Sequence, residues 1–442
     1  MKKILLLLVA LPFIVHAQFF PTEKSQIGGG AGMIWIDNMP HYSIRINPDL
    51  ALGKWGLGLD LNLEFTSEGK LRSESFKDFS DYLAIIRYIR YGQKKDPFYA
   101  QFGSVDFYTL GFGGLMYGYS NSPSFDKRKT GLVLDADFEK FGFESIYSDF
   151  SQGGIFGLRG FVRPLHFTDL KAIPFIGNLE VGVSYASDFN KNAHILAGGF
   201  DIDGNFVSTD DKGSFSGIGF DIGIPLVQQE MLNVTLYTEY SKLMDYGSGM
   251  STGLLVGFGL GPIVKGQAKL ERRFNNEEYV PSYFDALYEV QRFSSNGLGF
   301  ASKAAGLKGL KTNDNGFFGS LGLQVMGMFQ VVGSYSRFDK TPSSGILQLR
   351  SDVTPEDAPI VVRAGYDKVN IANDVDMFTL DDRSHMYVEA GYKPMPYMLV
   401  TLGYHWTFSP IRSANDDIVG YEPQKRLEPR VEFIMPLNFG GN

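Results

Sequence analysis

Strict alternation of apolar and polar residues is the feature that most constrains the fold of this 442-residue chain. From Trp55 to Phe65 every odd position carries a large apolar residue, whereas the even positions carry Gly, Asp, Asn or Glu. Only a β-strand places successive side chains on opposite faces. The same period returns in residues 232–240, 398–408 and 430–439. The pattern therefore predicts an all-β protein.

The length of the alternating segments favours a membrane-spanning sheet. They run for about nine to twelve residues, whereas strands of soluble sheets average about five or six and a tilted bilayer crossing needs about nine to eleven. Aromatic residues gather near the ends of these segments, as two aromatic girdles would require. They are Trp55, Phe65, Tyr185, Tyr240, Tyr392, Tyr404, Trp406 and Phe439. A spanning helix is not expected, because the best apolar stretch after residue 17, 254–264, is interrupted by three Gly and Pro262.

Short and long connections alternate along the chain, as periplasmic turns and outer loops do in transmembrane barrels. The predicted long connections are residues 67–79, 106–127, 189–213, 275–315, 368–384 and 409–427. Residues 164–178 form an unexpectedly long member of the short class. Counting from a first strand at 28–37 predicts about 20 strands with both termini on the short-turn side. The number is even, and it falls to 18 or 16 if outer hairpins have been counted as wall pairs.

A secreted soluble β-sandwich or propeller is the main alternative. A soluble sheet of this size would face water with Lys, Glu and Thr on its non-core side. Here one face of each strand is almost purely apolar, and the opposite face is rich in Gly and charge. A closed wall also removes the exposed edges of so large a sheet. We therefore predict a single antiparallel up-and-down transmembrane β-barrel over residues 18–442.

The N-terminus predicts export. Lys2 and Lys3 precede an apolar run from Ile4 to Val15, and Ala17 offers a cleavage site, as in a secretory signal peptide covering residues 1–17. The chain has no Cys, which excludes disulfides, thiolate metal sites and a lipid-modified N-terminal Cys. Its formal charge of −8 argues against a nucleic-acid partner, because phosphate recognition needs clustered Lys and Arg.

The last alternating segment, residues 427–439, carries a late aromatic residue, Phe439. In its signal peptide, alternating strands and final strand, the sequence resembles Gram-negative outer-membrane β-barrel proteins of the porin-like kind. The resemblance implies location in the outer membrane, contact with outer-membrane lipid, and insertion by the barrel assembly machinery. Gly440, Gly441 and Asn442 depart from the pattern, because the aromatic residue is then not terminal.

If the apolar faces contact lipid, the polar faces line the lumen, and charged residues of both signs are expected there. They are Arg45, Asp49, Asp60, Glu64, Asp135, Asp137, Arg159, Arg163, Glu180, Asp221, Glu239, Lys265, Lys269, Glu271, Arg273, Arg350, Arg363, Asp367, His385, Glu389, Arg430 and Glu432. The densest basic group lies between Lys265 and Arg273. These charges either set a field that tunes the selectivity of a pore or pair across neighbouring strands of a water-filled wall.

Two segments are candidates for narrowing the lumen. Residues 106–120 are too apolar for a solvated loop and too rich in Gly for a helix, so a loop folded back into the barrel would suit them. Within 275–315, residues 281–293 begin with Pro and place apolar residues at helical spacing, which predicts a short helix. This long loop is either a constriction or lid of the lumen, or a packed outer loop.

Motifs for catalysis or metal binding are weak. No HExxH or GxSxG motif occurs, and the only cluster to inspect is His385 with Glu389 and His405, for which ordinary lumen residues are the simpler interpretation. Residues 201–205 lack the Gly and Glu spacing of a calcium loop and predict a hairpin turn above the membrane. The acidic residues in 374–382 favour solvated charge over a cation site. No enzyme, metal or cofactor is therefore predicted.

Three functions remain open from the sequence. The first is an outer-membrane channel for passive passage of small polar solutes. The second is a non-conducting barrel that serves as scaffold or partner of a secretion or surface-attachment complex. The third is an outer-membrane barrel enzyme. The sequence fixes neither the solute nor the oligomeric state.

Overall fold

The structure is a computed structural model that describes residues 25–436 except 73–75, 77–78, 95, 152, 230, 262, 296–299, 312, 327, 354–358 and 415. The expected signal peptide, residues 1–17, lies outside the described residues, and so does Phe439. Within the described part of the chain, no helix is both long and apolar enough to cross a membrane.

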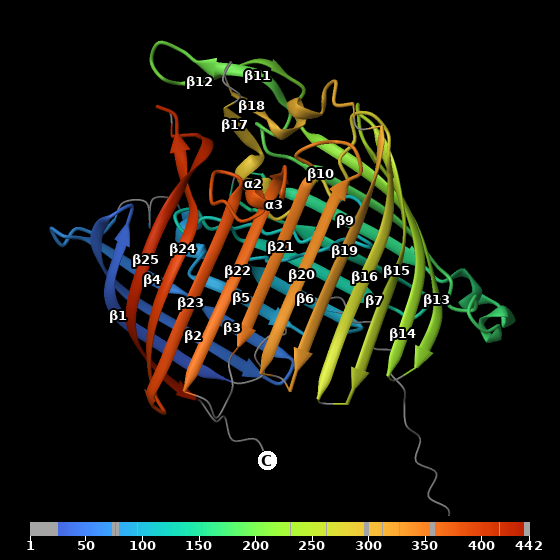
Figure 1. Cartoon of the computed structure of the whole chain (residues 1–442), viewed down its shortest axis with the longest axis horizontal. Helices are drawn as coiled ribbons and strands as arrows, with labels where there is room; N and C mark the ends of the chain where they lie inside the picture. Colours follow the sequence, from blue (N-terminus) through green and yellow to red (C-terminus); the bar gives the residue numbers. More distant parts are fainter. Residues whose placement is uncertain are drawn as a thin grey trace, which may run out of the picture.

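One closed antiparallel sheet forms the wall of a barrel (Figure 1). The sheet contains 21 strand segments. Two of them, β3 (Trp55–Leu59) and β4 (Leu61–Thr66), continue one another along β2, so the barrel has 20 wall strands. The predicted fold class and the count of about 20 are confirmed.

The remaining wall strands follow in chain order, each paired with its sequence neighbour in the wall. They are β1 (Gln26–Ile36), β2 (Met39–Leu52), β5 (Ile86–Tyr91), β6 (Phe98–Gly103), β7 (Gly131–Asp137), β8 (Phe141–Tyr147), β9 (Ile155–Val162), β10 (Glu180–Asp188), β13 (Phe215–Gln229), β14 (Leu232–Leu243), β15 (Ser248–Leu260), β16 (Val264–Asn275), β19 (Asp314–Val325), β20 (Phe329–Phe338), β21 (Gly345–Val353), β22 (Ile360–Ile371), β23 (Ser384–Met395), β24 (Met398–Arg412) and β25 (Ile418–Pro436).

The first and last strands close the barrel. β1 pairs with β25 in an antiparallel register that runs from Gln26 opposite Pro436 to Ile36 opposite Arg426. Glycine is required at this seam, because a Cβ atom on Gly30 would lie 2.3 Å from the backbone oxygen of Val431. Every backbone group in a lipid-facing wall needs a partner, and this pairing leaves the sheet without an open edge.

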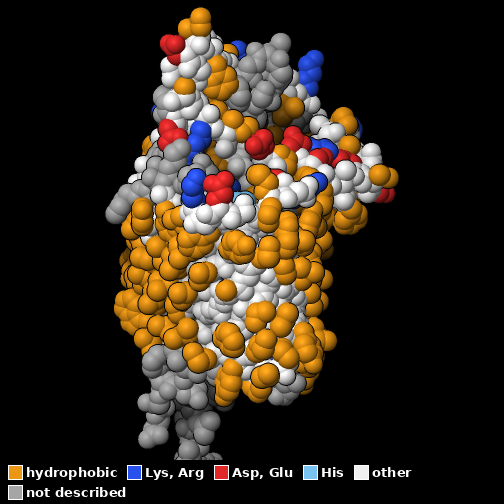
Figure 2. Space-filling view, turned by 90° about the vertical axis from the view of Figure 1, so that its left-hand side faces the viewer, with side chains coloured by type: hydrophobic (Ala, Val, Ile, Leu, Met, Phe, Trp, Pro, Cys, Tyr) orange, Lys and Arg blue, Asp and Glu red, His pale blue; other side chains and the backbone are white. Residues whose placement is uncertain are grey.

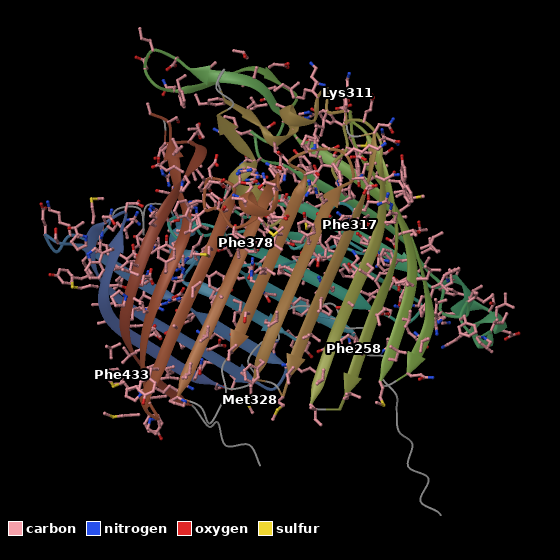
Figure 3. All side chains as sticks on the ribbon, viewed as in Figure 1. Phe258, Lys311, Phe317, Met328, Phe378 and Phe433 are labelled. Carbon is pink, nitrogen blue, oxygen red and sulfur yellow. The ribbon has the colours of Figure 1, made fainter. Side chains whose placement is uncertain are left out.

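The lipid-facing surface is a broad apolar belt. Figure 2 shows it on one face of the wall, with charged side chains confined to the upper part of that face. Outward residues such as Leu270, Phe317 and Phe433 are largely exposed, whereas their sequence neighbours face the interior. Figure 3 places Phe258 and Phe433 low on the wall and Phe317 higher. This alternation around a closed sheet is that of an outer-membrane β-barrel, as the sequence predicts.

Both ends of the wall lie on the side with most of the short connections, which is the periplasmic side in such barrels. The exception on this side is the connection between β9 and β10, as expected from residues 164–178. It contains two 3₁₀ helices, η2 (Pro164–Phe167) and η3 (Asp169–Ala172).

A second, smaller sheet stands above the outer end of the barrel (Figure 1). Its strands are ordered β12 (Phe206–Asp211), β11 (Ile195–Phe200), β18 (Phe300–Ser302) and β17 (Phe293–Ser295). The predicted hairpin turn at 201–205 joins β11 to β12. There the Asp201 carboxylate accepts the backbone N–H groups of Asp203 and Asn205 at 3.0 and 2.7 Å.

Two predicted boundaries are wrong. Residues 409–427 are not a long loop, because β24 and β25 extend through most of them and leave a short turn between Arg412 and Ile418. The other concerns 281–293, where only α2 (Tyr288–Gln291) is an α-helix. This short helix is stabilised mainly by burial of its side chains against other segments. The spacing of apolar residues along the sequence does not show such contacts.

Ion pairs order the acid-rich outer loop after β22. It contains α3 (Asp374–Met377), and its Asp376 and Asp381 carboxylates bond to Arg383. Asp381 also accepts from Lys368 at 2.8 Å. Although burial opposes the shift, these bonds lower the pKa of Asp381 to about 2. Two of the four acids in this loop, Asp376 and Asp381, are therefore paired with Lys368 and Arg383, whereas Asp374 and Asp382 are exposed.

Candidate functional site

The lumen of this barrel is too wide for wall side chains to fill. Twenty strands about 4.8 Å apart and tilted by about 40° give a circumference of about 125 Å and a backbone radius of about 20 Å. Eight-stranded barrels are filled by their own side chains, and wider ones hold water or inserted segments. What occupies the lumen therefore determines what this protein can do.

The structure places the charged residues predicted for the lumen on inward faces of wall strands or directly beyond strand ends. Each of these residues is flanked by residues of the outward face, so the placement follows from the alternation itself. The residues differ in their surroundings. Many are buried in ion pairs, and near the periplasmic ends of the strands Asp137 and Arg363 are partly exposed whereas Asp49 and Glu432 are buried.

Residues 104–130, here called the inward loop, enter the lumen and contact the wall at β8, β14 and β16. The Gly111 and Gly114 N–H groups donate to Glu144 at 2.8 Å and Glu239 at 2.9 Å. Lys269 donates to the carbonyl oxygen of Phe112. The Phe112 ring stacks on Tyr237 with 4.2 Å between centroids. The prediction that residues 106–120 fold back into the barrel is confirmed.

The same loop is fastened to the opposite side of the wall. Asp126 pairs with Arg72 and with Arg426 of β25, which lies 3.3 Å away. Thr407 of β24 donates to the carbonyl oxygen of Pro123 at 2.9 Å. Because its contacts reach from β8 through β19 and again to β24 and β25, the inward loop spans the lumen. Open space in the lumen at this level is therefore confined to gaps between the inward loop and the wall.

The described residues of the segment 276–313, here called the mouth loop, cover the inward loop from the outer side. Phe284 donates its N–H to the Leu115 carbonyl at 3.1 Å. The side chains of Tyr283, Phe284 and Tyr288 are fully buried and form one apolar cluster with the inward loop. The described part of the long loop predicted from residues 275–315 therefore packs against the inward loop.

A buried ion cluster locks the mouth loop to its neighbours. Glu289 of α2 binds Lys129 of the inward loop and lies 3.0 Å from Arg292. Arg292 also binds Asp188 of β10 at 2.6 Å. Although burial would raise it, Arg292 and Lys129 hold the pKa of Glu289 below its ordinary value. Breaking one partner would leave buried charge uncompensated, so the cluster holds the two loops and β10 together.

The basic group predicted on β16 lies under the inward loop. Glu271 lies between its two neighbours on the same face, 2.8 Å from both Lys269 and Arg273. It also accepts the Tyr237 hydroxyl at 2.7 Å. The expected excess of positive charge is therefore reduced locally by pairing.

A second cluster centres on Arg159 of β9. Its guanidinium lies 2.6 Å from Asp221, 2.7 Å from Glu180 and 3.4 Å from Glu144. These pairs join four wall strands along one level of the lumen. They support the interpretation that part of the inward charge holds neighbouring strands together.

The periplasmic half of the lumen is more accessible. The side chains of Arg87, Asp137 and Arg363 are 42%, 37% and 47% exposed, whereas that of Arg426 in the outer half is fully buried. Lys265 is exposed as well. Figure 3 shows side chains crowded in the upper part of the barrel and sparse in the lower part. We refer to this accessible region as the vestibule.

A cavity of about 180 Å³ lies between the inward loop and the wall at β21, β22 and β23. Its lining is mixed, with carboxylates, hydroxyls, one guanidinium and an aromatic ring. The lining residues are Ser104, Val105, Asp106, Ser120, Ser122, Pro123, Ala286, Arg350, Asp367, His385 and Tyr387. Arg350 and Asp367 pair at 2.7 Å, whereas Asp106 is exposed and accepts the Ser120 hydroxyl. The cavity is therefore a polar gap beside the inward loop.

His385, Glu389 and His405 do not form a catalytic set. Tyr387 separates the two imidazoles, with ring centroids 6.3 Å from His385 and 6.4 Å from His405. Glu389 is bound to Arg430 at 2.6 Å. In the part of the chain that the structure describes, no group of three His, Asp or Glu residues is placed to hold a metal ion.

Sequence reasoning missed Arg426, which joins the wall to the inward loop, and its wall partner Glu428. Arg426 binds Glu64, Asp126 and Glu428. Both residues continue the inward face of Arg430 and Glu432, so the alternation could have found them. Pro423 argued against extending the strand in the N-terminal direction, because proline is unusual inside a strand. Here Pro423 lies beyond the end of β1, and β1 is not paired with β25 at Pro429.

No family model matches the sequence, and no curated protein matches it. The solved structure of Pseudomonas aeruginosa OccD3 (OpdP) is 10% identical, with 94% of this chain and 91% of that chain covered and a TM-score of 0.30. OccK10 (OpdN) of the same organism is 9% identical, with 94% of this chain and 99% of that chain covered and a TM-score of 0.32. The ferric enterobactin receptor (PfeA) is 10% identical, with 94% of this chain and 82% of that chain covered and a TM-score of 0.34. The fold assignment rests on the closed sheet and its apolar belt.

Proposed function

We propose that this outer-membrane β-barrel is a passive channel for small polar solutes and that the inward loop limits its conductance. The observation that carries the proposal is the arrangement of the lumen. A vestibule lined by both signs of charge leads to a loop that is fastened to the wall by individual polar bonds and by one aromatic stack. The polar bonds can exchange with water, although the loop also packs into an apolar cluster with the wall and the mouth loop.

The solute path runs along the inward charged residues that the sequence predicts, from Lys265, Arg363 and Asp137 in the vestibule towards the cavity beside Asp106. Mixed charge favours polar solutes without a strong preference for one sign. The cavity of about 180 Å³ is the narrow part of this path. It would admit only small solutes in the conformation described here.

The second candidate is a non-conducting barrel that serves a surface complex. It is favoured by the complete burial of Tyr283, Phe284 and Tyr288 in the outer half of the lumen. If the mouth loop never opens, the barrel is a scaffold for its outer sheet and not a pore.

Ion current through the purified protein in planar bilayers tests the proposal. Tyr108 and Tyr119 are bonded to each other by backbone N–H···O bonds of 2.8 and 2.9 Å, so residues 109–118 can be replaced by two glycines without moving the loop ends. We expect small, steady currents from the wild type and a several-fold larger conductance from this variant.

A silent wild type with a conducting variant would favour the non-conducting candidate, because the loop would then be a plug. Silence of both proteins, with the barrel shown to be folded, would contradict a channel altogether. Reconstitution of a porin of known conductance in the same bilayers controls for the recording itself.

We further propose that residues 1–17 direct export of the chain and are cleaved off after Ala17, and that the barrel assembly machinery inserts the protein. The apolar run and small residues before the cleavage site support the first part, and the alternating last strand supports the second. Mass spectrometry of the mature protein should give an N-terminus at Gln18. Depletion of the assembly machinery should remove the protein from the outer membrane.

A further inference from the structure

The connection between β9 and β10 is held in a defined position by polar contacts. Lys171 lies 2.7 Å from Glu139 in the turn between β7 and β8. His166 bonds to Asn178 at 2.7 Å, and Asn178 in turn donates to Gln228 near the periplasmic end of β13 at 2.5 Å. The segment is therefore tied to the wall on both sides.

Its apolar side chains are left outside these contacts. Neither η2 nor η3 has a buried residue. The side chains that point away from the protein are large, and each is between 40% and 62% exposed. They are Phe167, Leu170, Ile173, Phe175 and Ile176. Five large apolar groups within ten consecutive residues are unusual for a turn that faces water.

Phe175 shows that the turn itself does not explain this composition. Its φ of +67° lies in the left-handed region, which bulky side chains rarely adopt and which Gly or Asn would satisfy more easily. The backbone therefore holds an aromatic ring at the tip of the turn in spite of an unfavourable conformation. Such an arrangement points to a contact that the ring makes outside the protein.

The exposed group is continuous with the lipid-facing belt. Phe138 and Phe141, in and next to the β7–β8 turn, are exposed aromatic residues with ring centroids 5.3 Å apart. The Lys140 ammonium lies 5.1 Å from the Phe167 ring and connects the two groups. Figure 1 shows the connection, in green at the right, projecting sideways from the wall beside β13. It extends the belt outward along the membrane and not downward into the periplasm.

We propose that residues 164–176 form an anchor that lies in the periplasmic leaflet of the outer membrane, with phospholipid as its partner. The five apolar side chains insert between acyl chains, as the apolar faces of interfacial segments do. Lys140, Lys171 and His166 lie where headgroup phosphates are found. The anchor thereby fixes the depth and rotation of one side of the barrel relative to the bilayer.

A periplasmic protein is the competing occupant, and the shape of the segment argues against it. The apolar residues lie on a projecting turn that is continuous with the lipid belt, so a protein bound there would have to displace lipid next to β7, β8 and β13. Lipid already surrounds this part of the wall. The established interface therefore extends onto the segment without a new partner.

The absence of Cys from the chain allows a clean test with single-cysteine variants. Phe175→Cys is the test position, Leu270→Cys on the lipid face is the positive control, and Asp203→Cys on the outer hairpin is the aqueous control. Each variant of the full-length barrel is labelled with the polarity-sensitive dye NBD. It is then reconstituted in vesicles of phosphatidylethanolamine and phosphatidylglycerol.

We expect the label at Phe175→Cys to emit to the blue of the Asp203→Cys label and to be quenched by doxyl-labelled phospholipids. Its quenching constant with aqueous iodide should be at least roughly threefold lower than that at Asp203→Cys, because interfacial segments sit about 5–10 Å deep. If the Leu270→Cys label reports lipid while the Phe175→Cys label is quenched by iodide as strongly as Asp203→Cys, the anchor is refuted and the segment faces the periplasm. Ile173→Cys provides a second position with the same expectation, independent of the unusual backbone at Phe175.

Discussion

Removing the Phe112 ring should release the inward loop without unfolding the wall. Phe112 lies on the loop, is 8% exposed, and stacks nearly parallel to Tyr237 at an interplanar angle of 4°. The Arg159 guanidinium lies 5.7 Å from the same ring. In Phe112→Ala all three features are lost, whereas no wall strand loses a residue of its own.

The expected size follows from burial and stacking. Burying a Phe side chain contributes about 2 kcal/mol, and an aromatic stack adds about 1 kcal/mol. A loss of about 3 kcal/mol shifts the equilibrium between docked and undocked loop by about 100-fold, because each 1.4 kcal/mol is a factor of ten. Wide-open events that are rare in the wild type should then occur about 100-fold more often.

Single-channel recording at constant voltage measures the frequency of these events. Phe317→Ala is the matched control, because it removes the same side chain from the lipid face of β19. Resistance of the barrel to unfolding in SDS without heating should be the same for both variants and the wild type. If the event frequency of Phe112→Ala equals that of Phe317→Ala, the inward loop does not limit conductance through this contact.

Three further predictions concern the wall and the outer loops. Arg426→Met leaves three buried carboxylates short of a counter-charge and should lower the free energy of unfolding in urea by about 3–5 kcal/mol; a loss below about 1 kcal/mol would contradict the assigned ion pairs. The pKa of Asp381 is about 2, below its ordinary value of about 3.9, so its bonds stabilise the α3 loop above about pH 4 and are lost as the pH falls towards 2. A nitroxide on Val375→Cys should therefore become mobile over that range, and Asp381→Asn should make it mobile already at neutral pH; unchanged spectra in Asp381→Asn would refute the role of the carboxylate. Gly30→Val should prevent closure of the wall, because its side chain meets the backbone of β25, and it should accumulate as protease-sensitive, unassembled protein, whereas Ala31→Val on the outward face should assemble normally.

The wall could be predicted from the sequence because lipid and water act on every residue of it. In the segment from Trp55 to Phe65, each odd residue faces lipid and each even residue faces the lumen. The strand and its two faces can therefore be recognised from neighbouring residues alone. The inward loop could be predicted only in part. Its unusual content of Gly and aromatics indicated burial, but Phe112 has no local signal that selects Tyr237 as its partner.

Pairing across the lumen could not be predicted. Arg426 and Asp126 are far apart in the chain and meet only because the loop crosses to the last strand. Nothing in either neighbourhood encodes that meeting. The α2 helix failed for a related reason, since its four residues are stabilised by contacts of Tyr288 and Glu289 with other segments and not by helical propensity.

The seam between β1 and β25 has a consequence for the order of events during biogenesis. The wall becomes a closed surface only when β25, the last of the described wall strands in the chain, reaches β1. Until then β1 and β24 present unpaired backbone, which lipid cannot satisfy and which another chain could capture. Contacts between strands so far apart in the sequence form slowly, because they close a very long loop. The seam therefore works as a check on completeness: a chain that stops short of β25 cannot become a stable resident of the membrane.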